Sequence, residues 1–263
     1  MRILFLNQAP RSPKGGSEGV GYNVDKVEKQ LNSYASPGTK VEVGFPDDYA
    51  GSKAADAIGK QSMLNGLHHM METPAIVRKI VWASENGYDA VIQSNTFDPG
   101  VDGGRLAVKI PVIGLFRTSI HTATMLADQI GITVPLASHV PYVRRMLRAH
   151  GLSDYVVGVK PIGIYGDDIP DHKEEIFDIT TNLIKGLVND GAELIVPLGG
   201  ALIPYVVDPV DLQKATGAPV INTKAIGINF AELCVKMKMV HSPLTYPAAA
   251  MKYADFGESM FKK

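Results

Sequence analysis

Short apolar runs rich in valine and isoleucine alternate along the chain with longer amphipathic stretches. The short runs predict strands at residues 3–7, 41–45, 90–94, 112–116, 133–137, 155–159, 194–198 and 220–222. The longer stretches predict helices at residues 74–86, 118–130, 141–150, 171–190 and 224–239. This alternation is typical of parallel sheets flanked by helices, so the sequence predicts an α/β fold.

One segment of the chain is similar to a later one. Residues 87–96 read GYDAVIQSNT and residues 191–200 read GAELIVPLGG. Each has a helix-ending glycine, an acidic residue, an apolar strand and then small residues, and the strand opening PVI follows each segment, at 111–113 and at 219–221. Any two βαβ units share some of these features, but the common order favours two related half-domains.

Two related halves would place equivalent loops opposite each other. We expect pseudo-symmetric halves, one made of residues 1–116 and 225–263 and the other of residues 117–224. A pseudo-two-fold axis would then bring loops 94–100 and 199–203 face to face across a cleft, at the carboxyl ends of strands where α/β sheets bind ligands. Such a cleft suits a reaction that moves a proton from one face of a carbanion to the other.

The composition excludes several classes of function. The net charge is -1, the pI is near 6.7, and the basic residues form no stripe that would follow a phosphate backbone. No run of about 18 apolar residues indicates a membrane span. The glycine-rich segment 15–21 (GGSEGVG) lacks the Lys-Ser/Thr pair of a phosphate loop, and no Cys/His spacing indicates zinc. We therefore expect a cytoplasmic protein that binds neither nucleic acid nor membranes and uses no cofactor or metal.

Four short motifs resemble those of a known family. They are NQAP at 7–10, NTFDPG at 95–100, PVIG at 111–114 and LGGAL at 198–202. In this order and spacing they resemble the hydantoin racemase branch of the aspartate/glutamate/hydantoin racemase superfamily, over nearly the whole chain. The resemblance implies an α/β fold in two halves, a cofactor-independent enzyme and a homo-oligomer.

The chain departs from this family at its chemical centre. The resemblance implies two cysteines, a thiolate base and a thiol acid on opposite faces of the substrate's α-carbon. The second cysteine maps onto Gly200, and the first maps onto Ser94, Asn95 or Thr96, depending on the motif that is matched. An amide is no base, and a hydroxyl is too weakly acidic unless a neighbouring group activates it. The two-thiol mechanism is therefore excluded.

Other groups must then transfer the proton. The candidates are Asp98, His121 and Tyr165, with the hydroxyls of Ser94 and Thr96. Asp98 precedes Pro-Gly, where an aspartate often stabilises a turn or caps the following helix. His121 lies in the first turns of a predicted helix, whose dipole would favour a neutral imidazole, although a packing role is commoner. Tyr165 either lines the cleft or belongs to an exposed loop.

A second group of residues is expected to hold the substrate. Strand-end amides, small polar side chains and arginines suit a carboxylate or an enolate oxygen. These residues are Asn7, Arg11, Asn95, Arg117, Thr118, Ser119, Gly199 and Gly200. As surface residues, the two arginines would need no such role.

The sequence leaves three interpretations of the function open. The first is a racemase- or isomerase-like enzyme that acts next to a carboxylate or carbonyl of a small acid or cyclic amide by non-thiol proton transfer. The second is a lyase, decarboxylase or hydrolase with an enolate-type intermediate, favoured by the room that a glycine at position 200 gives to a bulkier substrate or to water. The third is a small-molecule binding protein that has lost catalysis.

Thiol alkylation tests the non-thiol interpretation. Cys234, the single cysteine, is predicted inside the last helix as a small buried hydrophobe remote from both loops. We therefore expect iodoacetamide to leave turnover unchanged. Complete inactivation that a bound ligand prevents would contradict this expectation.

Overall fold

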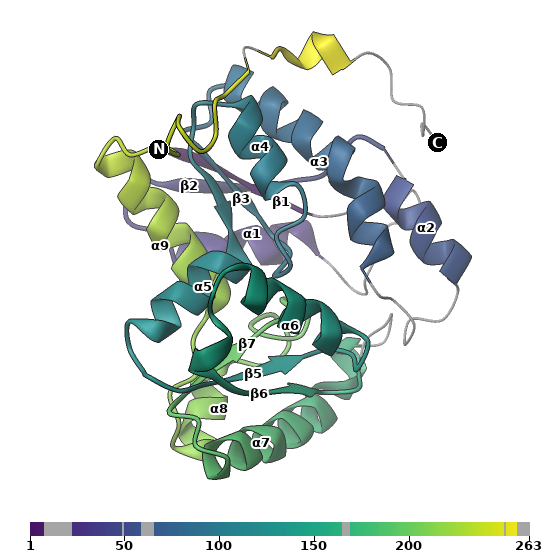
Figure 1. Ribbon diagram of the computed structural model, residues 1–263, viewed down its shortest axis with the longest axis vertical. Coiled ribbons are helices and arrows are strands. Elements are labelled where there is room, and N and C mark those ends of the chain that lie inside the picture. Colours follow the sequence, from purple (N-terminus) through teal and green to yellow (C-terminus); the bar gives the residue numbers. More distant parts are fainter. Residues whose placement is uncertain (8–22, 49, 59–65, 165–168, 250, 257–263) are drawn as a thin grey trace.

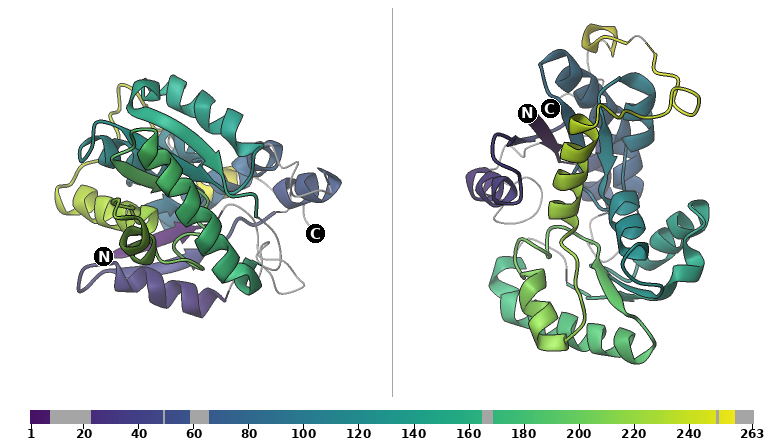
Figure 2. Two further views of the ribbon diagram at one scale, coloured as in Figure 1. Left: turned by 90° about the horizontal axis from the view of Figure 1, so that it is seen from below. Right: turned by 90° about the vertical axis from the view of Figure 1, so that its left-hand side faces the viewer.

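Buried β-branched residues build two parallel sheets, each covered by helices. The computed structural model describes residues 1–7, 23–48, 50–58, 66–164, 169–249 and 251–256. The two sheets lie one above the other along the long axis of the molecule (Figure 1), and the side view of Figure 2 separates the two halves. The predicted α/β class with parallel sheets flanked by helices is confirmed.

The first sheet has the strand order β2-β1-β3-β4, and all of its pairs are parallel. Its strands are β1 (Arg2–Leu6), β2 (Lys40–Gly44), β3 (Ala90–Gln93) and β4 (Val112–Gly114). All residues of β3 are buried, as expected for a strand that is covered on both faces. One face packs against α1 (Val24–Ser33) and α9 (Thr223–Lys236), and the other against α3 (Leu67–Glu85) and α4 (Val101–Ala107). Helix α2 (Ala50–Ile58) packs on α3.

The second sheet repeats this strand order. It runs β6-β5-β7, with β5 (Ile130–Val134), β6 (Val156–Pro161) and β7 (Leu194–Pro197). Val220 pairs with Ile195 beside β7, in the place that β4 takes beside β3. Helices α5 (Leu115–Thr124) and α6 (His139–Ala149) cover one face, and α7 (Lys173–Asn189) and α8 (Pro209–Thr216) cover the other. Short 3₁₀ turns lie at Ser153–Tyr155, Ile169–His172 and Tyr253–Phe256.

Helices α5 and α9 connect the two halves. Helix α5 follows β4 directly and packs against both α9 and β7. Helix α9 follows the second sheet and returns the chain to the first, where it packs on β3 and β4. The half-domain boundaries after residues 116 and 224 stay predictions.

The segment after α5 differs from the prediction. The predicted helix at 118–130 is wrong at its end, because α5 stops at Thr124 and Ile130 begins β5. The sequence of β5 is IGITV, and every residue is buried. Its first apolar residue, Ile130, happens to continue the apolar spacing of α5, although it belongs to a strand. The strand predicted at 133–137 therefore lies three residues too late.

Helix α3 also differs from the prediction, since it begins at Leu67 and continues through Pro74. A proline inside a helix removes one backbone hydrogen bond, which here is outweighed by the packing of the buried Ile76 and Ile80 on the first sheet. The shorter helices α1, α2, α4 and α8 were not predicted, because none of them is longer than ten residues and their periodic patterns are correspondingly short.

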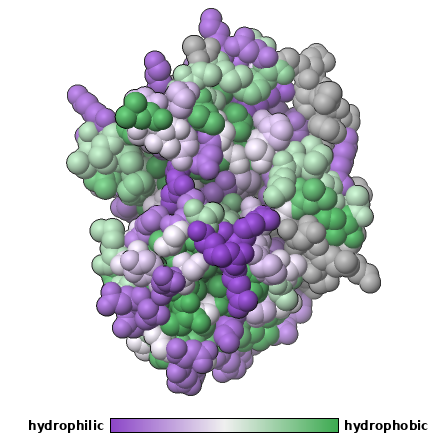
Figure 3. All heavy atoms as spheres, in the orientation of Figure 1, coloured by the Kyte–Doolittle hydropathy of each residue, from purple (hydrophilic) through white to green (hydrophobic). Residues whose placement is uncertain are grey.

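Helix α6 illustrates how amphipathic spacing orients a helix. Its buried residues His139, Val143 and Leu147 are spaced by four, while Arg144 and Arg148 point outward. Strongly hydrophilic side chains accordingly gather over α6 in the middle of the face shown in Figure 3. Among the described residues, no helix is long and apolar enough to cross a membrane.

The crossing of α9 over α5 requires a glycine. A side chain at Gly227 would overlap Leu115 Cδ2, whereas a side chain at Gly186 of α7 would meet no atom within 4 Å. We expect G227A to lower the free energy of unfolding by about 1–3 kcal/mol through overpacking. The matched control G186A should be neutral or stabilise by up to about 1 kcal/mol, because alanine favours helices. Urea unfolding measures both, and equal stabilities would contradict this close packing.

Candidate active site

The carboxyl ends of the two sheets meet directly. The Gly199 N–H, which follows β7, donates to Thr96 Oγ1 of the loop after β3 at 2.8 Å. Thr96 is only 1% exposed, so this hydrogen bond is shielded from water. The loops at 94–100 and 199–203, expected to face each other, are therefore in contact. We call the meeting point of Asn7, Ser94, Thr96, Gly199, Gly200 and Lys224 the strand-end junction.

The first-half loop is held in shape by its own polar side chains. Ser94 donates through Oγ to Asn7 Oδ1 at 2.8 Å, which joins the ends of β3 and β1. Asn95 Oδ1 accepts from the Phe97 N–H at 2.8 Å, and the Asn95 N–H donates to Gln93 Oε1 at 2.6 Å. Asn95 thus shapes the turn that places Ser94 and Thr96 at the junction.

Lys224 is the main residue of the junction that the sequence did not reveal. It is the second residue of α9 and is 2% exposed. Its amino group donates to the carbonyl oxygen of Ser94 and lies 5.4 Å from the ring centre of Phe5 and 5.8 Å from that of Tyr205. The sequence predicted Lys224 only as the start of a helix. The signal that could have indicated it is a single lysine in the otherwise uncharged segment that follows the predicted strand at 220–222.

The amino group of Lys224 fills the place of a side chain at Gly200. A Cβ at this glycine would overlap both Nζ and Cε of Lys224. Gly200 is the position onto which the second-half cysteine was mapped, so an amine stands where a thiol was expected. The room that the glycine was expected to give to a bulkier substrate or to water is therefore taken, and this reason for a lyase or hydrolase is wrong.

The surroundings of Lys224 favour a neutral amine. Burial lowers the pKa of its ammonium to about 7, against the opposing influence of the Asp98 carboxylate. The amine also lies in the first turn of α9, where the helix dipole disfavours a positive charge. At neutral pH a large fraction of Lys224 can therefore accept a proton.

Asp98 caps a helix, but not the one that follows it. Its backbone has a φ of 52°, and its two carboxylate oxygens accept from the N–H groups of Phe116 (2.8 Å) and Arg117 (3.1 Å) at the start of α5. The N-cap position, Gly114, has no side chain to make these bonds, and a Cβ there would overlap the carboxylate. Burial raises the pKa of Asp98 to about 6, although these hydrogen bonds and nearby arginines counteract it.

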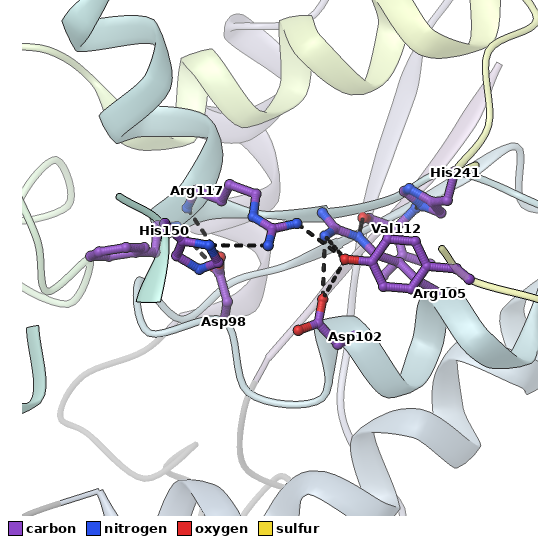
Figure 4. A network of polar contacts seen from close by, with 9 residues as sticks. Asp98, Asp102, Arg105, Val112, Arg117, His150 and His241 are labelled. Atoms are coloured by element: carbon purple, nitrogen blue, oxygen red, sulfur yellow. Dashed lines mark hydrogen bonds and ion pairs between the residues drawn. The ribbon is translucent and has the colours of Figure 1, made fainter. Parts of the chain in front are cut away.

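Arg117 was expected to bind the substrate, but its side chain contacts other residues. Its guanidinium lies 3.1 Å from His150 Nδ1 and donates to Tyr246 Oη at 3.2 Å. Tyr246 in turn donates to Asp102 at 3.1 Å and accepts from Arg105, so the network ties α5 to α4, α6 and the C-terminal segment (Figure 4). Among the described residues, the Arg117 side chain thus bonds to Tyr246 and His150 and not to the strand-end junction.

The remaining candidates that the structure describes belong to α5. His121 is exposed and lies in the last turn of α5, so the expected effect of the helix N-terminus is wrong. Its pKa is lowered instead by partial burial and by Arg117. Ser119 is fully buried in α5 and Thr118 is half-buried. Arg11 and Tyr165 lie outside the described residues.

An aromatic and histidine cluster packs beside the junction. Phe97, directly after Thr96, lies 5.6 Å from the ring of His69 on α3 and 5.0 Å from that of His139 on α6. Burial lowers the pKa of His139 to about 4 and that of His69 well below its ordinary value. The side chains are therefore neutral, and Phe97 joins the two halves by apolar packing.

Cys234 lies far from these groups. It is buried in α9 against the first sheet, and burial raises the pKa of its thiol. Ten residues of helix separate it from Lys224, which corresponds to about 15 Å. The predicted location of this cysteine in a helix, as a buried side chain, is confirmed.

The chain is similar to known proteins in sequence and in fold. The chain is 26% identical over 182 residues to a hydantoin racemase from Pseudomonas sp. (strain NS671), covering 68% of this chain and 72% of that protein. It is 28% identical over 174 residues to a hydantoin racemase from Rhizobium meliloti, covering 65% and 70%. The structure of an allantoin racemase from Klebsiella pneumoniae matches with a TM-score of 0.78 and 19% identity, over 100% of this chain and 98% of that one.

The two parallel sheets that meet at their strand ends form the same α/β fold as that allantoin racemase structure. The family model described as Asp/Glu/Hydantoin racemase matches residues 24–231. The chain therefore belongs to the Asp/Glu/hydantoin racemase family and is an isomerase-type enzyme. The resemblance that the sequence motifs indicated is confirmed.

The buried amine predicts that stability depends on pH. The pKa of Lys224 is about 7 in the folded protein, against an ordinary value of 10.5. Between these values the unfolded chain holds a proton that the folded protein has released, so the free energy of unfolding rises with pH. From pH 7 to pH 10 the contribution is on the order of 4 kcal/mol.

Urea unfolding of variants isolates this contribution. K224M removes the titrating group and keeps an unbranched side chain, so it should lose this rise between pH 7 and pH 10. K29M, at an exposed lysine of α1, is the matched control and should keep it. The same pH dependence in wild type and K224M would contradict a buried amine with a lowered pKa.

Proposed function

We propose that this chain is a cofactor-independent racemase or isomerase that moves a proton at a carbon next to a carbonyl, without a thiol. The observation that carries the proposal is the hydrogen bond between Gly199 and Thr96, because it brings together the two loops that would supply groups to opposite faces of one carbon. Relatives named as hydantoin racemases and a structural neighbour named as an allantoin racemase favour a hydantoin-like cyclic amide over an acyclic acid.

Polar groups at the junction suit a developing enolate. Loss of a proton from a carbon next to a carbonyl places negative charge on the carbonyl oxygen, and preorganised donors stabilise that charge. Ser94 and Asn7 lie at adjacent strand ends and are already joined by a hydrogen bond, so their positions are fixed before a substrate binds. The backbone N–H groups of Gly199 and Asn95 already donate to Thr96 Oγ1 and Gln93 Oε1, so they fix the two loops rather than bind the substrate.

The charged candidates have less support as substrate ligands. Asp98 uses both carboxylate oxygens to cap α5, and the Arg117 guanidinium is engaged with His150 and Tyr246. We therefore assign to Asp98 and Arg117 the task of fixing α5 beside the junction. A neutral cyclic amide needs no arginine to bind, which agrees with this assignment.

Exchange in heavy water tests the proposed function. Single enantiomers of 5-substituted hydantoins and of allantoin are incubated with the protein in deuterated buffer, and deuterium at the ring carbon and optical rotation are followed. Isomerase activity predicts exchange together with loss of optical rotation. Product fragments without exchange would indicate a lyase or hydrolase, and binding without either reaction would indicate a protein that has lost catalysis; each of these would contradict the proposal.

A pair of variants links the reaction to the junction. T96V keeps the shape of the side chain but leaves the Gly199 N–H without its acceptor. We expect this loss to lower the free energy of unfolding by about 1–3 kcal/mol. We expect T96V to lose most of the exchange activity and T96S, which keeps the hydroxyl, to retain it. Full activity in folded T96V would show that the contact between the loops is not needed.

A further inference from the structure

We propose that Lys224 is the proton-transfer group on the second-half face of the substrate, where it replaces the thiol that the resemblance to racemases implies at position 200. The proposal rests on the proposed function and deepens it, because it names the group that handles the proton. It also restricts the substrate to molecules whose C–H bond is weakened by an adjacent carbonyl, since an amine is a moderate base.

The first support is that the Lys224 amine occupies the space that a side chain at position 200 would fill. Nζ of Lys224 reaches the space beside Gly200 that a side chain at position 200 would need. The lysine comes from α9 and the glycine from the loop after β7, so two separate segments combine to put one functional group in this place. A side chain at position 200 would therefore displace the amino group of this lysine from its present place.

The second support is the link between Lys224 and the opposite loop. Its amino group donates to the Ser94 carbonyl oxygen, and Ser94 belongs to the first-half loop. The amine therefore lies between the two loops rather than behind one of them. Gly200 itself is only half-buried, so the loop that borders the amine is partly open to solvent.

The third support is the state of charge. A base must be neutral to accept a proton, and catalysis is most efficient when the pKa of the base is near the working pH. Burial and the first turn of α9 shift Lys224 in this direction. The groups that face it from other elements are the Asp98 carboxylate, whose charge opposes the shift, the Tyr205 and Phe5 rings and the carbonyl oxygen of Ser94.

The step is balanced with water as the second proton carrier. The lone pair of the neutral amine forms an N–H bond as the substrate's C–H bond breaks, and the C–H electron pair moves into the carbonyl to give an enolate. The configuration inverts when a water molecule on the first-half face gives a proton to the opposite side of the carbon, and the ammonium then returns its proton to the hydroxide. A proton returned by the ammonium itself restores the original configuration, and in heavy water both routes introduce deuterium at the carbon.

Variants at Lys224 test its role in the exchange reaction. We expect K224M to reduce the deuterium exchange rate by roughly 10²–10⁴-fold, the usual contribution of general acid–base catalysis. In the wild type the rate should fall below an apparent pKa near 7, and this decrease should be absent from the residual activity of K224M. K29M again serves as the control. Circular dichroism and thermal unfolding identify variants that do not fold.

Chemical rescue separates a catalytic lysine from a structural one. K224A leaves a space at the junction that a small primary amine can occupy. We expect ethylamine to restore exchange in K224A, with a pH profile that follows the pKa of the added amine, and to have no effect on the wild type. A lysine that only supports the Ser94 loop would not transfer the pH profile of the added amine.

A reciprocal exchange of residues tests the shared position. G200C alone places a thiol against the amine, so we expect it to be inactive or unstable. K224A/G200C removes the amine and supplies the thiol, and we expect it to exchange deuterium at least tenfold faster than K224A and to become sensitive to iodoacetamide. A folded double variant no faster than K224A would overturn the equivalence of the two positions.

The outcomes distinguish the two proposals. Wild-type protein that exchanges no deuterium into any hydantoin overturns the proposed function and the role of Lys224 together. Active wild type with a folded K224M that keeps its rate and its decrease near pH 7 overturns the role of Lys224 alone. Loss of exchange in K224M with rescue of K224A by ethylamine supports both.

Discussion

An amine that is shielded from water must lose its charge or face an anion, because an isolated buried charge is strongly unfavourable. Lys224 satisfies this constraint where the carboxyl ends of the two sheets meet. The Ser94 carbonyl accepts a hydrogen bond from the amine, and the field of Asp98 partly offsets the burial that favours the neutral form. The result is a group that can take or give a proton near neutral pH at a site without a cysteine.

Close packing around Lys224 also determines the backbone conformation of the neighbouring loop. Gly199 has a φ of 100°, in the left-handed region, and a side chain there would overlap Pro135. This conformation lets its N–H donate to Thr96, while Gly200 leaves room for the amine. On the other side of the junction, Asp98 fixes the first turn of α5. The loops are thus held by close packing and short polar contacts, which gives a preorganised site rather than an open surface.

The sequence predicted the fold class, the family and the pairing of the two loops, because strand periodicity and motif order are local signals. It did not predict Lys224, whose contact with Ser94 joins residues 130 positions apart. It also misplaced His121, since an apolar strand that begins at Ile130 extends the helical pattern and moves the predicted helix three residues along the chain. Asp98 was a candidate for proton transfer, with capping of the following helix only as the alternative; that it caps α5 instead depends on tertiary packing that a single sequence does not display.

A crystal structure of the protein with a slowly reacting cyclic amide bound would test the role of Lys224 most directly. We expect the ring to bind at the strand-end junction beside Gly200, with the carbon next to its carbonyl roughly 3–3.5 Å from Nζ of Lys224, the separation needed for reaction. A ligand bound at another place would contradict this role of Lys224. A ligand at the junction whose reactive carbon is separated from the amine by the backbone of Gly200 would contradict it as well.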